Sequence, residues 1–271
     1  MNKNRILLGG LAALFIQTQT LTAEFLGRTA SEVVEITFLE GWRTADGRHM
    51  AGLQIELAPG WKTYWRAPGD GGVPTQIRLH NADGITGLQI SWPTPEVFFT
   101  NGIRSIGYRD NVTLPVEISV SEDGDVMLDG QVDFGVCLDV CMPISLDLEG
   151  LLPATQTPDA RIIAALSDGP LSAQEFGAGA VTCTIEPISD GLRIHAEIPI
   201  ATAGPTETVV FELPDPSIWI SEAQVERRGG TLFAVADIVP SDAGPFALNR
   251  SDLLITVLSA RQSVELQGCH G

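Results

Sequence analysis

The first half of the chain repeats short runs in which apolar and polar residues alternate, separated by Gly, Pro, Asn and Asp. Side chains point to opposite faces along a strand, so a period of two is typical of β-strands with one buried face. Helical periodicity is largely absent there. Short strands at this spacing predict a β-sandwich. The predicted strands cover residues 33–42, 50–59, 76–80, 88–93, 112–121, 125–136 and 144–152.

The same alternation returns after residue 180 and predicts a second, smaller sandwich. Its predicted strands cover residues 181–188, 191–200, 206–214, 219–227, 231–240, 252–260 and 262–269. We therefore expect an all-β protein with one domain over residues 24–152 and another over residues 180–271.

The alternation of apolar and polar residues stops over residues 153–179, which form the predicted connector. A short helix is expected from Pro158 to Leu166, because Ile162, Ile163 and Leu166 fit one helical face. Proline at its start and the pair Asp168-Gly169 after its end are ordinary helix boundaries.

The first 23 residues have the pattern of a secretory signal peptide. Lys3 and Arg5 precede an apolar run from Ile6 to Ile16, which is too short to span a bilayer, and small or polar residues end at Ala23. No later run reaches the ~18 uninterrupted apolar residues of a membrane helix. We expect cleavage after Ala23, export to the periplasm and a mature chain that does not span the membrane.

The charge of the chain excludes two classes of partner. With 16 Lys and Arg against 34 Asp and Glu, the formal net charge is −18, and removal of Lys3 and Arg5 makes it −20. Such a surface repels nucleic acid and anionic lipid. The ordinary explanation of so acidic a surface is that it keeps the protein soluble.

Four cysteines in an exported chain favour two disulfides, because disulfides persist in oxidising compartments. Cys183 lies in the first strand of the second domain and Cys269 just after its last. A bridge between them would close 87 residues and stabilise the fold by roughly 4 to 5 kcal/mol, as a structural disulfide does.

Cys137 and Cys141 flank a three-residue loop, Leu138-Asp139-Val140, between two predicted strands. Opposed positions at the mouth of a hairpin bring Cα atoms within the reach of a disulfide. The closed loop is so short that such a bond stabilises little, and strained, exposed disulfides are the more easily reduced ones. This pattern favours a redox-active pair.

Other functions remain open for the same two cysteines. A plain structural bridge is one, and copper(I) binding is another, because thiolates and the Met142 thioether are soft ligands. A histidine close in space would strengthen a copper site, and the candidates are His49, His80 and His195. Zinc is weaker, because the other two cysteines are remote and not closely paired.

Several motifs occur in an order that resembles a known family. The motifs are Gly60 to Asp70 (GWKTYWRAPGD), Trp92 to Pro95 (WPTP), Gly107 to Asp110 (GYRD) followed by Leu114 to Val116, and Val136 to Pro143 with its two cysteines. Together they are similar to the N-terminal periplasmic domain of the thiol:disulfide interchange protein DsbD, and more closely to its ScsB (suppressor of copper sensitivity) branch. The resemblance spans Glu32 to Leu152. The second half resembles the further β-domain of ScsB-like proteins only in general.

The resemblance implies an immunoglobulin-like domain that relays electrons between protein dithiols and disulfides, with no cofactor. By position, Cys141 would form the intermolecular mixed disulfide and Cys137 would resolve it. Residues 97–101, with Phe98 and Phe99, match the family's cap loop over the cysteines. Aromatic positions around the site are matched by Tyr64 and Tyr108, although core packing alone would also explain these aromatics.

Asp139 would tune the pair by opposing thiolate formation, although a loop aspartate is usually just solvated. The implied partners are periplasmic thioredoxin-like oxidoreductases. The chain departs from the whole family protein, because it carries neither a transmembrane electron conduit nor a thioredoxin-like domain. We therefore expect a separate membrane electron donor to recharge it.

Overall fold

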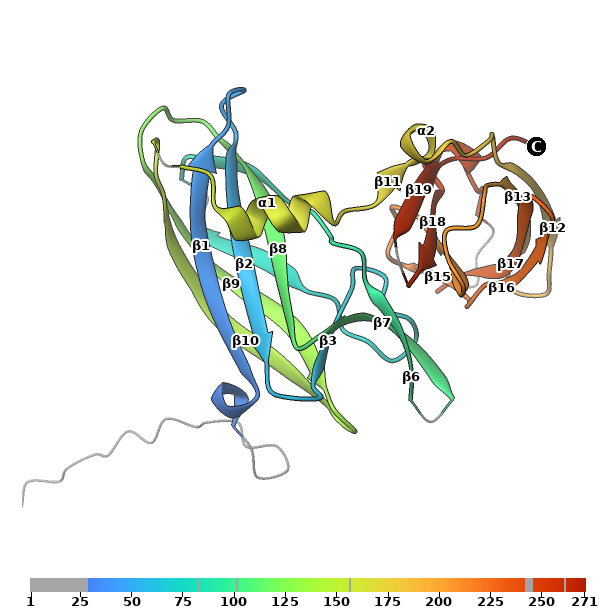
Figure 1. Ribbon diagram of the computed structural model, residues 1–271, viewed down its shortest axis with the longest axis horizontal. Coiled ribbons are helices and arrows are strands. Elements are labelled where there is room, and N and C mark those ends of the chain that lie inside the picture. Colours follow the sequence, from blue (N-terminus) through green and yellow to red (C-terminus); the bar gives the residue numbers. More distant parts are fainter. Residues whose placement is uncertain (1–28, 82, 101, 156, 242–245, 261) are drawn as a thin grey trace, which may run out of the picture.

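A computed structural model describes residues 29–271, apart from 82, 101, 156, 242–245 and 261. It contains two immunoglobulin-like β-sandwiches joined by a short helical connector, as the sequence predicts (Figure 1). The predicted signal peptide lies outside the described residues. Among the described residues, no helix is both long and apolar enough to cross a bilayer.

The first sandwich packs a four-stranded sheet, in the order β1-β2-β8-β5, against a six-stranded sheet, in the order β10-β9-β3-β7-β6 with β4 also paired to β9. The strands of the first sheet are β1 (Val34–Arg43), β2 (His49–Leu57), β8 (Asn111–Val120) and β5 (Ile85–Ile90). Those of the second are β10 (Cys141–Leu152), β9 (Val126–Cys137), β3 (Lys62–Tyr64), β7 (Ile103–Arg109), β6 (Glu96–Thr100) and β4 (Gln76–Asn81).

The core of the first sandwich lies between these two sheets. Leu53, Ile55 and Ile118 enter it from one sheet and Val132 and Phe134 from the other, all almost fully buried. The inward residues of β9 are Val132, Phe134 and Val136, so the residues between them, Asp133 and Gly135, lie on the outer face of the sheet. Cys137 continues this outward series at the end of the strand.

The second sandwich pairs a sheet in the order β11-β19-β18-β14 with a sheet in the order β12-β13-β17-β15, to which β16 adds by pairing with β17. The first contains β11 (Leu171–Ser172), β19 (Ser263–Gln267), β18 (Leu254–Ser259) and β14 (Glu207–Glu212). The second contains β12 (Thr182–Pro187), β13 (Leu192–Pro199), β17 (Thr231–Pro240), β15 (Ile218–Ile220) and β16 (Gln224–Arg228).

The connector contains α1 (Ala160–Ser167), which begins after Asp159, whose carboxylate accepts a hydrogen bond from the Arg161 backbone N–H. The helix lies across the β1-β2-β8 sheet (Figure 1). Of its three predicted apolar contacts only Ile162 is fully buried, against Leu39 and Met50, while Ile163 and Leu166 remain exposed. The outer face of a sheet is nearly flat and buries few side chains of a helix that lies on it. Here Gly52, which has no side chain, leaves room for Ile162.

The end of the connector contributes structure that the sequence did not predict. The short strand β11 pairs in parallel with β19, and α2 (Ala173–Phe176) follows it directly. The second sandwich is therefore tied to its connector by a β-ladder as well as by the continuous chain.

Candidate redox site

The two loop cysteines form a disulfide at the end of the β9–β10 hairpin. Cys137 and Cys141 are directly opposed in the antiparallel register, and their Cα atoms are 4.2 Å apart. This is close to the ~4.5 Å of opposed residues that do not exchange backbone hydrogen bonds. The disulfide lies on the outer face of the six-stranded sheet, away from the core between the sheets.

The two sulfur-bearing residues differ in exposure. Cys137 is 2% exposed, whereas Cys141 is an exposed residue. Cys141 is therefore the less shielded of the two residues toward a thiolate from outside, and Cys137 is the residue that the protein buries.

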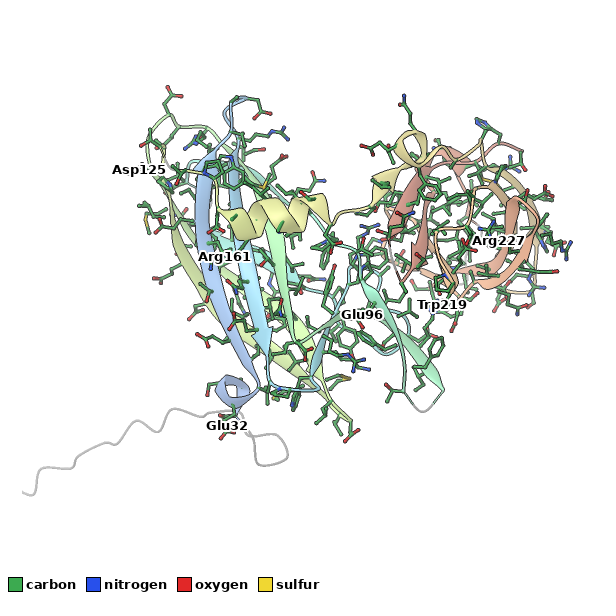
Figure 2. All side chains as sticks on the ribbon, in the orientation of Figure 1. Glu32, Glu96, Asp125, Arg161, Trp219 and Arg227 are labelled. Atoms are coloured by element: carbon green, nitrogen blue, oxygen red, sulfur yellow. A yellow bond between two sulfur atoms is a disulfide. The ribbon has the colours of Figure 1, made fainter. Side chains whose placement is uncertain are left out.

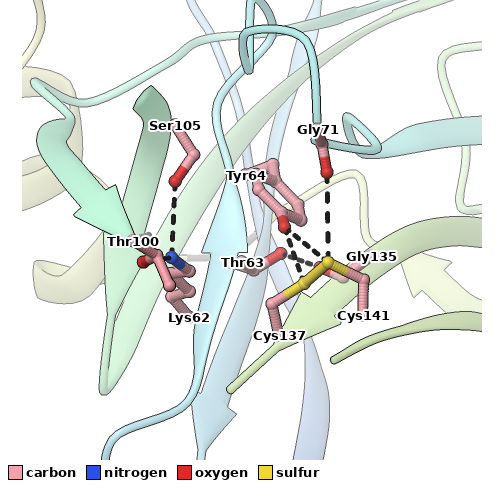
Figure 3. Close-up of a disulfide and its surroundings, with 9 residues drawn as sticks. All are labelled: Lys62, Thr63, Tyr64, Gly71, Thr100, Ser105, Gly135, Cys137 and Cys141. Carbon is pink, nitrogen blue, oxygen red and sulfur yellow. Dashed lines mark hydrogen bonds between the residues drawn. A yellow bond between two sulfur atoms is a disulfide. The ribbon is translucent and has the colours of Figure 1, made fainter. Parts of the chain in front are cut away.

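Tyr64 is the side chain that reaches the sulfurs. Its hydroxyl lies 2.7 Å from Cys137 Sγ and 3.0 Å from Cys141 Sγ (Figure 3). Because disulfide sulfurs carry no hydrogen, the phenol is the donor in both contacts. Burial raises the pKa of Tyr64, so the hydroxyl keeps its proton at neutral pH.

Glycines hold the Tyr64 ring against the hairpin. A Cβ at Gly135, on β9, would lie 3.2 Å from Tyr64 Cδ2 and 3.0 Å from the Val73 side chain. A Cβ at Gly72 would lie 2.7 Å from Tyr64 Cδ1. Only residues without a side chain leave this space, which fixes the hydroxyl at the disulfide.

The segment Gly69 to Val73 passes over the disulfide on the outer face of the sheet. The Gly71 carbonyl oxygen lies 3.9 Å from Cys141 Sγ (Figure 3), and the Val73 carbonyl accepts a hydrogen bond from the Gly135 backbone N–H at 3.2 Å. In the dithiol form the Cys141 thiol faces an acceptor at Gly71. We call residues 69–73 the cover segment; sequence reasoning did not assign it to the site.

A cation lies on the same face of the sheet. Lys62 is the cross-strand partner of Cys137, and its ammonium contacts Thr100 Oγ1 at 3.0 Å and Ser105 Oγ at 3.4 Å. Burial, and then the charge of Arg109, lower the pKa of Lys62. Positive charge near a cysteine favours its thiolate, and Lys62 supplies one on the same face of the sheet, with its ammonium directed toward Thr100 and Ser105 (Figure 3).

The predicted cap aromatics lie farther along the sheet. Phe98, on β6, is buried on the outer face beneath the charged groups of Lys62 and Arg109, at 5.2 Å and 4.9 Å from its ring centroid. The strands β3 and β7 lie between β6 and β9. Phe99 is 69% exposed near the end of the β6–β7 hairpin.

The other two predicted site residues are Tyr108 and Asp139. Tyr108 packs in the core on the opposite face of the sheet from Tyr64, and its hydroxyl donates to the Pro93 carbonyl at 2.8 Å. Asp139 is exposed in the loop between the cysteines.

The soft-metal ligands suggested by the sequence are dispersed. Met142 is buried in the core, on the opposite face of β10 from Cys141. His49 contacts the Glu40 carbonyl, His80 contacts Asp129 and His195 contacts Glu186. Over the described part of the chain, no three His, Cys, Asp or Glu side chains gather as metal ligands would.

The second disulfide joins the two sheets of the second sandwich. Cys183, on β12, bonds to Cys269, which follows β19, across a sequence separation of 86. The two residues are 3% and 8% exposed and belong to the second core. The chain end is also paired to β12, because the Cys183 N–H donates to the His270 carbonyl at 2.7 Å.

Comparison with known proteins found a family match for the first sandwich and a solved structure with a similar fold. Residues 35–153 match the family described as thiol:disulfide interchange protein DsbD, N-terminal. The crystal structure of the N-terminal periplasmic domain of ScsB from Proteus mirabilis has the same fold, with a TM-score of 0.67 at 22% identity. That likeness covers 93% of this chain and 98% of the other, so it includes both sandwiches. Among curated proteins, none matches the chain significantly in sequence.

Proposed function

We propose that the chain passes reducing equivalents between protein dithiols and disulfides through Cys137 and Cys141, in keeping with the match of residues 35–153 to the DsbD N-terminal family of thiol:disulfide interchange proteins. One observation carries the proposal: an exposed cysteine is bonded to a buried one, and a buried tyrosine donates to both sulfurs. Attack at the first and release of the second are the two events that exchange requires.

The exchange proceeds in two balanced steps. A partner's thiolate attacks Cys141 Sγ, a new intermolecular disulfide forms, the Cys137–Cys141 bond breaks and Cys137 leaves as a thiolate. The partner's second thiolate then attacks its own sulfur in the mixed disulfide, and Cys141 leaves. Two electrons have moved to the chain, and the partner keeps a disulfide. The reverse sequence passes the electrons to the next oxidised protein.

Tyr64 and Lys62 assist the step in which Cys137 leaves. A hydrogen bond from the phenol stabilises the developing thiolate, and the ammonium on the same face favours negative charge. Lower basicity of the leaving sulfur makes exchange faster. Tyr64 is therefore a catalytic residue in this mechanism, because it touches the reacting atoms.

The β6–β7 hairpin acts as the outer part of the cap. Phe98 packs beneath two cations on the cysteine face, whereas Phe99, the next residue of β6, lies on the other face and presents an exposed apolar side chain near the hairpin end to a docking protein. Tyr108 supports the sheet from the core side through its bond to Pro93.

The partners that fit this chemistry are periplasmic thioredoxin-like oxidoreductases, with a separate membrane protein as electron donor. Export by the N-terminal segment would bring the chain to the compartment of these partners. Copper(I) binding by the same two thiols has less support, because Met142 is buried on the other face of β10 and the histidines have partners elsewhere.

Single cysteine variants test the proposal. The reduced chain is mixed with an oxidised thioredoxin-like protein, and the transfer of the disulfide is followed by alkylation and mass spectrometry. Cys141→Ser is expected to abolish transfer, whereas Cys137→Ser traps a covalent complex through Cys141. Transfer at the wild-type rate by both variants would falsify the assignment. A copper(I) titration against a competing chelator tests the rival function in the same variants.

A further inference from the structure

Few backbone hydrogen bonds tie the cover segment to the rest of the first sandwich. Three of its five residues are glycine, and glycine loses the most conformational freedom on ordering. The Pro68 carbonyl, just before the segment, accepts from Ile106 N–H at 3.0 Å, and the Val73 carbonyl accepts from Gly135 N–H at 3.2 Å. Between these two points lies Gly71, whose carbonyl faces Cys141.

The second sandwich holds the chain immediately before the cover segment. Arg66 forms a bidentate ion pair with Glu212 of β14, with both N···O distances 2.9 Å, and a second pair with Glu265 of β19 at 2.6 Å. The Arg66 side chain is only 20% exposed. Burial lowers its pKa, but the bonds and charges of the two carboxylates outweigh burial, and the pKa is raised.

The second sandwich also contacts the cover segment itself. Trp219, on β15, donates its indole N–H to Asp70 Oδ1 at 3.1 Å. Trp219 lies on the side of the second sandwich that faces the first (Figure 2). Asp70 directly precedes Gly71, so one peptide unit separates this contact from the carbonyl over Cys141.

These polar contacts are part of a packed interface. Val210 of β14 and Leu258 of β18 belong to the hydrophobic cluster of the first sandwich. Arg104 of β7 lies 3.2 Å from Glu222, and Thr94 Oγ1 lies 2.8 Å from Ser263 Oγ. The two sandwiches therefore form a joint with apolar and charged contacts, and the chain leading over the disulfide runs through it.

We propose that the second sandwich is a positioning domain for the redox site: through Arg66 and Asp70 it holds the cover segment over Cys141 and limits the access of attacking thiolates. The inference builds on the proposed function of the Cys137–Cys141 pair. Asp70, Arg66 and Trp219 are positioning residues, because they act on the sulfur only through the cover segment. Release of the contacts lets the glycine-rich segment move off the sulfur.

Reduction by dithiothreitol measures this access without a protein partner. One dithiothreitol thiolate attacks the disulfide and displaces a cysteine thiolate; its second thiol closes the oxidised ring and frees the other cysteine, so two electrons enter the chain. The fraction of each disulfide reduced over time is read by alkylation and mass spectrometry. Cys183–Cys269 in the same molecule reports any general loosening of the fold.

Trp219→Phe and Asp70→Ala each remove the indole contact and are expected to speed reduction of Cys137–Cys141 about fivefold, the effect of one hydrogen bond. Reduction of Cys183–Cys269 stays at the wild-type rate. The double variant should be no faster than Asp70→Ala alone, because that variant has already lost the indole contact. Glu265→Gln, which weakens the Arg66 contact, should accelerate reduction in the same sense.

Two controls separate positioning from charge and from general destabilisation. Asp70→Asn removes the negative charge but keeps the acceptor oxygen, so it should resemble wild type. Asp237→Asn breaks an ion pair of similar geometry, with Arg193, inside the second sandwich and should leave the rate unchanged.

Selective acceleration in Trp219→Phe and Asp70→Ala supports the inference. An unchanged or slower rate, equal acceleration of both disulfides, or equal acceleration in Asp70→Asn would overturn it. Because dithiothreitol replaces the partner, these outcomes do not depend on whether a thioredoxin-like protein exchanges with the chain.

Discussion

The two disulfides of this chain are built in opposite ways. Cys137–Cys141 joins neighbours across a hairpin mouth on the outer face of a sheet, with one exposed residue and a tyrosine hydroxyl at both sulfurs. Cys183–Cys269 joins β12 of the second sandwich to the chain end, with both residues buried in the core. Under the proposed function, the first disulfide serves exchange and the second serves stability.

The loss of chain entropy on closing each loop also predicts a small stabilisation from the first disulfide and a large one from the second. A closed loop of five residues is worth roughly 2 kcal/mol, whereas a loop of 87 residues is worth roughly 4.5 kcal/mol. Breaking the short loop also leaves β9 and β10 paired along the rest of their twelve-residue lengths. A redox centre requires this: the bond opens and closes while the fold beneath stays intact.

Removal of each pair should separate the two roles most strongly. Cys183→Ser with Cys269→Ser is expected to lower the free energy of unfolding of the second sandwich by about 4 to 5 kcal/mol, against about 2 kcal/mol or less for the first sandwich in Cys137→Ser with Cys141→Ser. Denaturant unfolding with probes in each sandwich measures both. Equal losses, or a larger loss from the hairpin pair, would contradict the division.

Tyr64→Phe should slow exchange about tenfold, because the leaving thiolate loses its hydrogen-bond donor. The raised pKa of Tyr64 keeps the phenol protonated from about pH 6 to 9, so the loss should be uniform over that range. Tyr108→Phe is the matched control, because its hydroxyl contacts Pro93 on the core side. The tyrosine has no role at the sulfurs if both variants exchange alike.

Phe99→Ala should weaken docking without changing the disulfide itself. We expect exchange with a thioredoxin-like protein to fall about threefold to fivefold, as for a moderate interface residue. Reduction by dithiothreitol should remain at the wild-type rate. Met127→Ala, which removes a similarly exposed apolar residue of β9 remote from the hairpin mouth, is the control. If Phe99→Ala slowed both exchange and reduction by dithiothreitol, the substitution would have disturbed the fold and not the docking of a partner.

Asp139→Asn should have the smallest effect. Removing a solvated negative charge from the loop favours an attacking thiolate by about twofold, and the difference should disappear at high salt. Stopped-flow reduction at two ionic strengths measures it. A large effect that persists in salt would mean that Asp139 acts by direct contact.

The long strands could be predicted from the sequence because their apolar residues alternate regularly. The alternation reveals β9 and β10, and hence a hairpin with a cysteine at each foot. The short strands β3, β6 and β7 were not predicted, because their Trp, Gly and Pro neighbours obscure the period. These strands carry Lys62, Tyr64 and Phe98.

The neighbours of the disulfide depend on tertiary contacts that one sequence does not encode locally. The motif around Tyr64 includes the aromatic that contacts the sulfurs, but nothing in its spacing separates Tyr64 from Tyr108, which faces the core. Ile163 and Leu166 likewise follow the helical pattern of Ile162 and remain exposed, because the helix contacts the sheet along a narrow line. The contact of Trp219 with Asp70 joins residues 149 positions apart, beyond the reach of any periodicity.

The measurement that tests the account most directly is a redox titration of both disulfides in the folded chain, read by alkylation and mass spectrometry. We expect Cys137–Cys141 to titrate as a reversible two-electron couple above about −300 mV while Cys183–Cys269 remains oxidised. Joint reduction of the two bonds, or reduction of Cys137–Cys141 only when the fold is lost, would contradict the account.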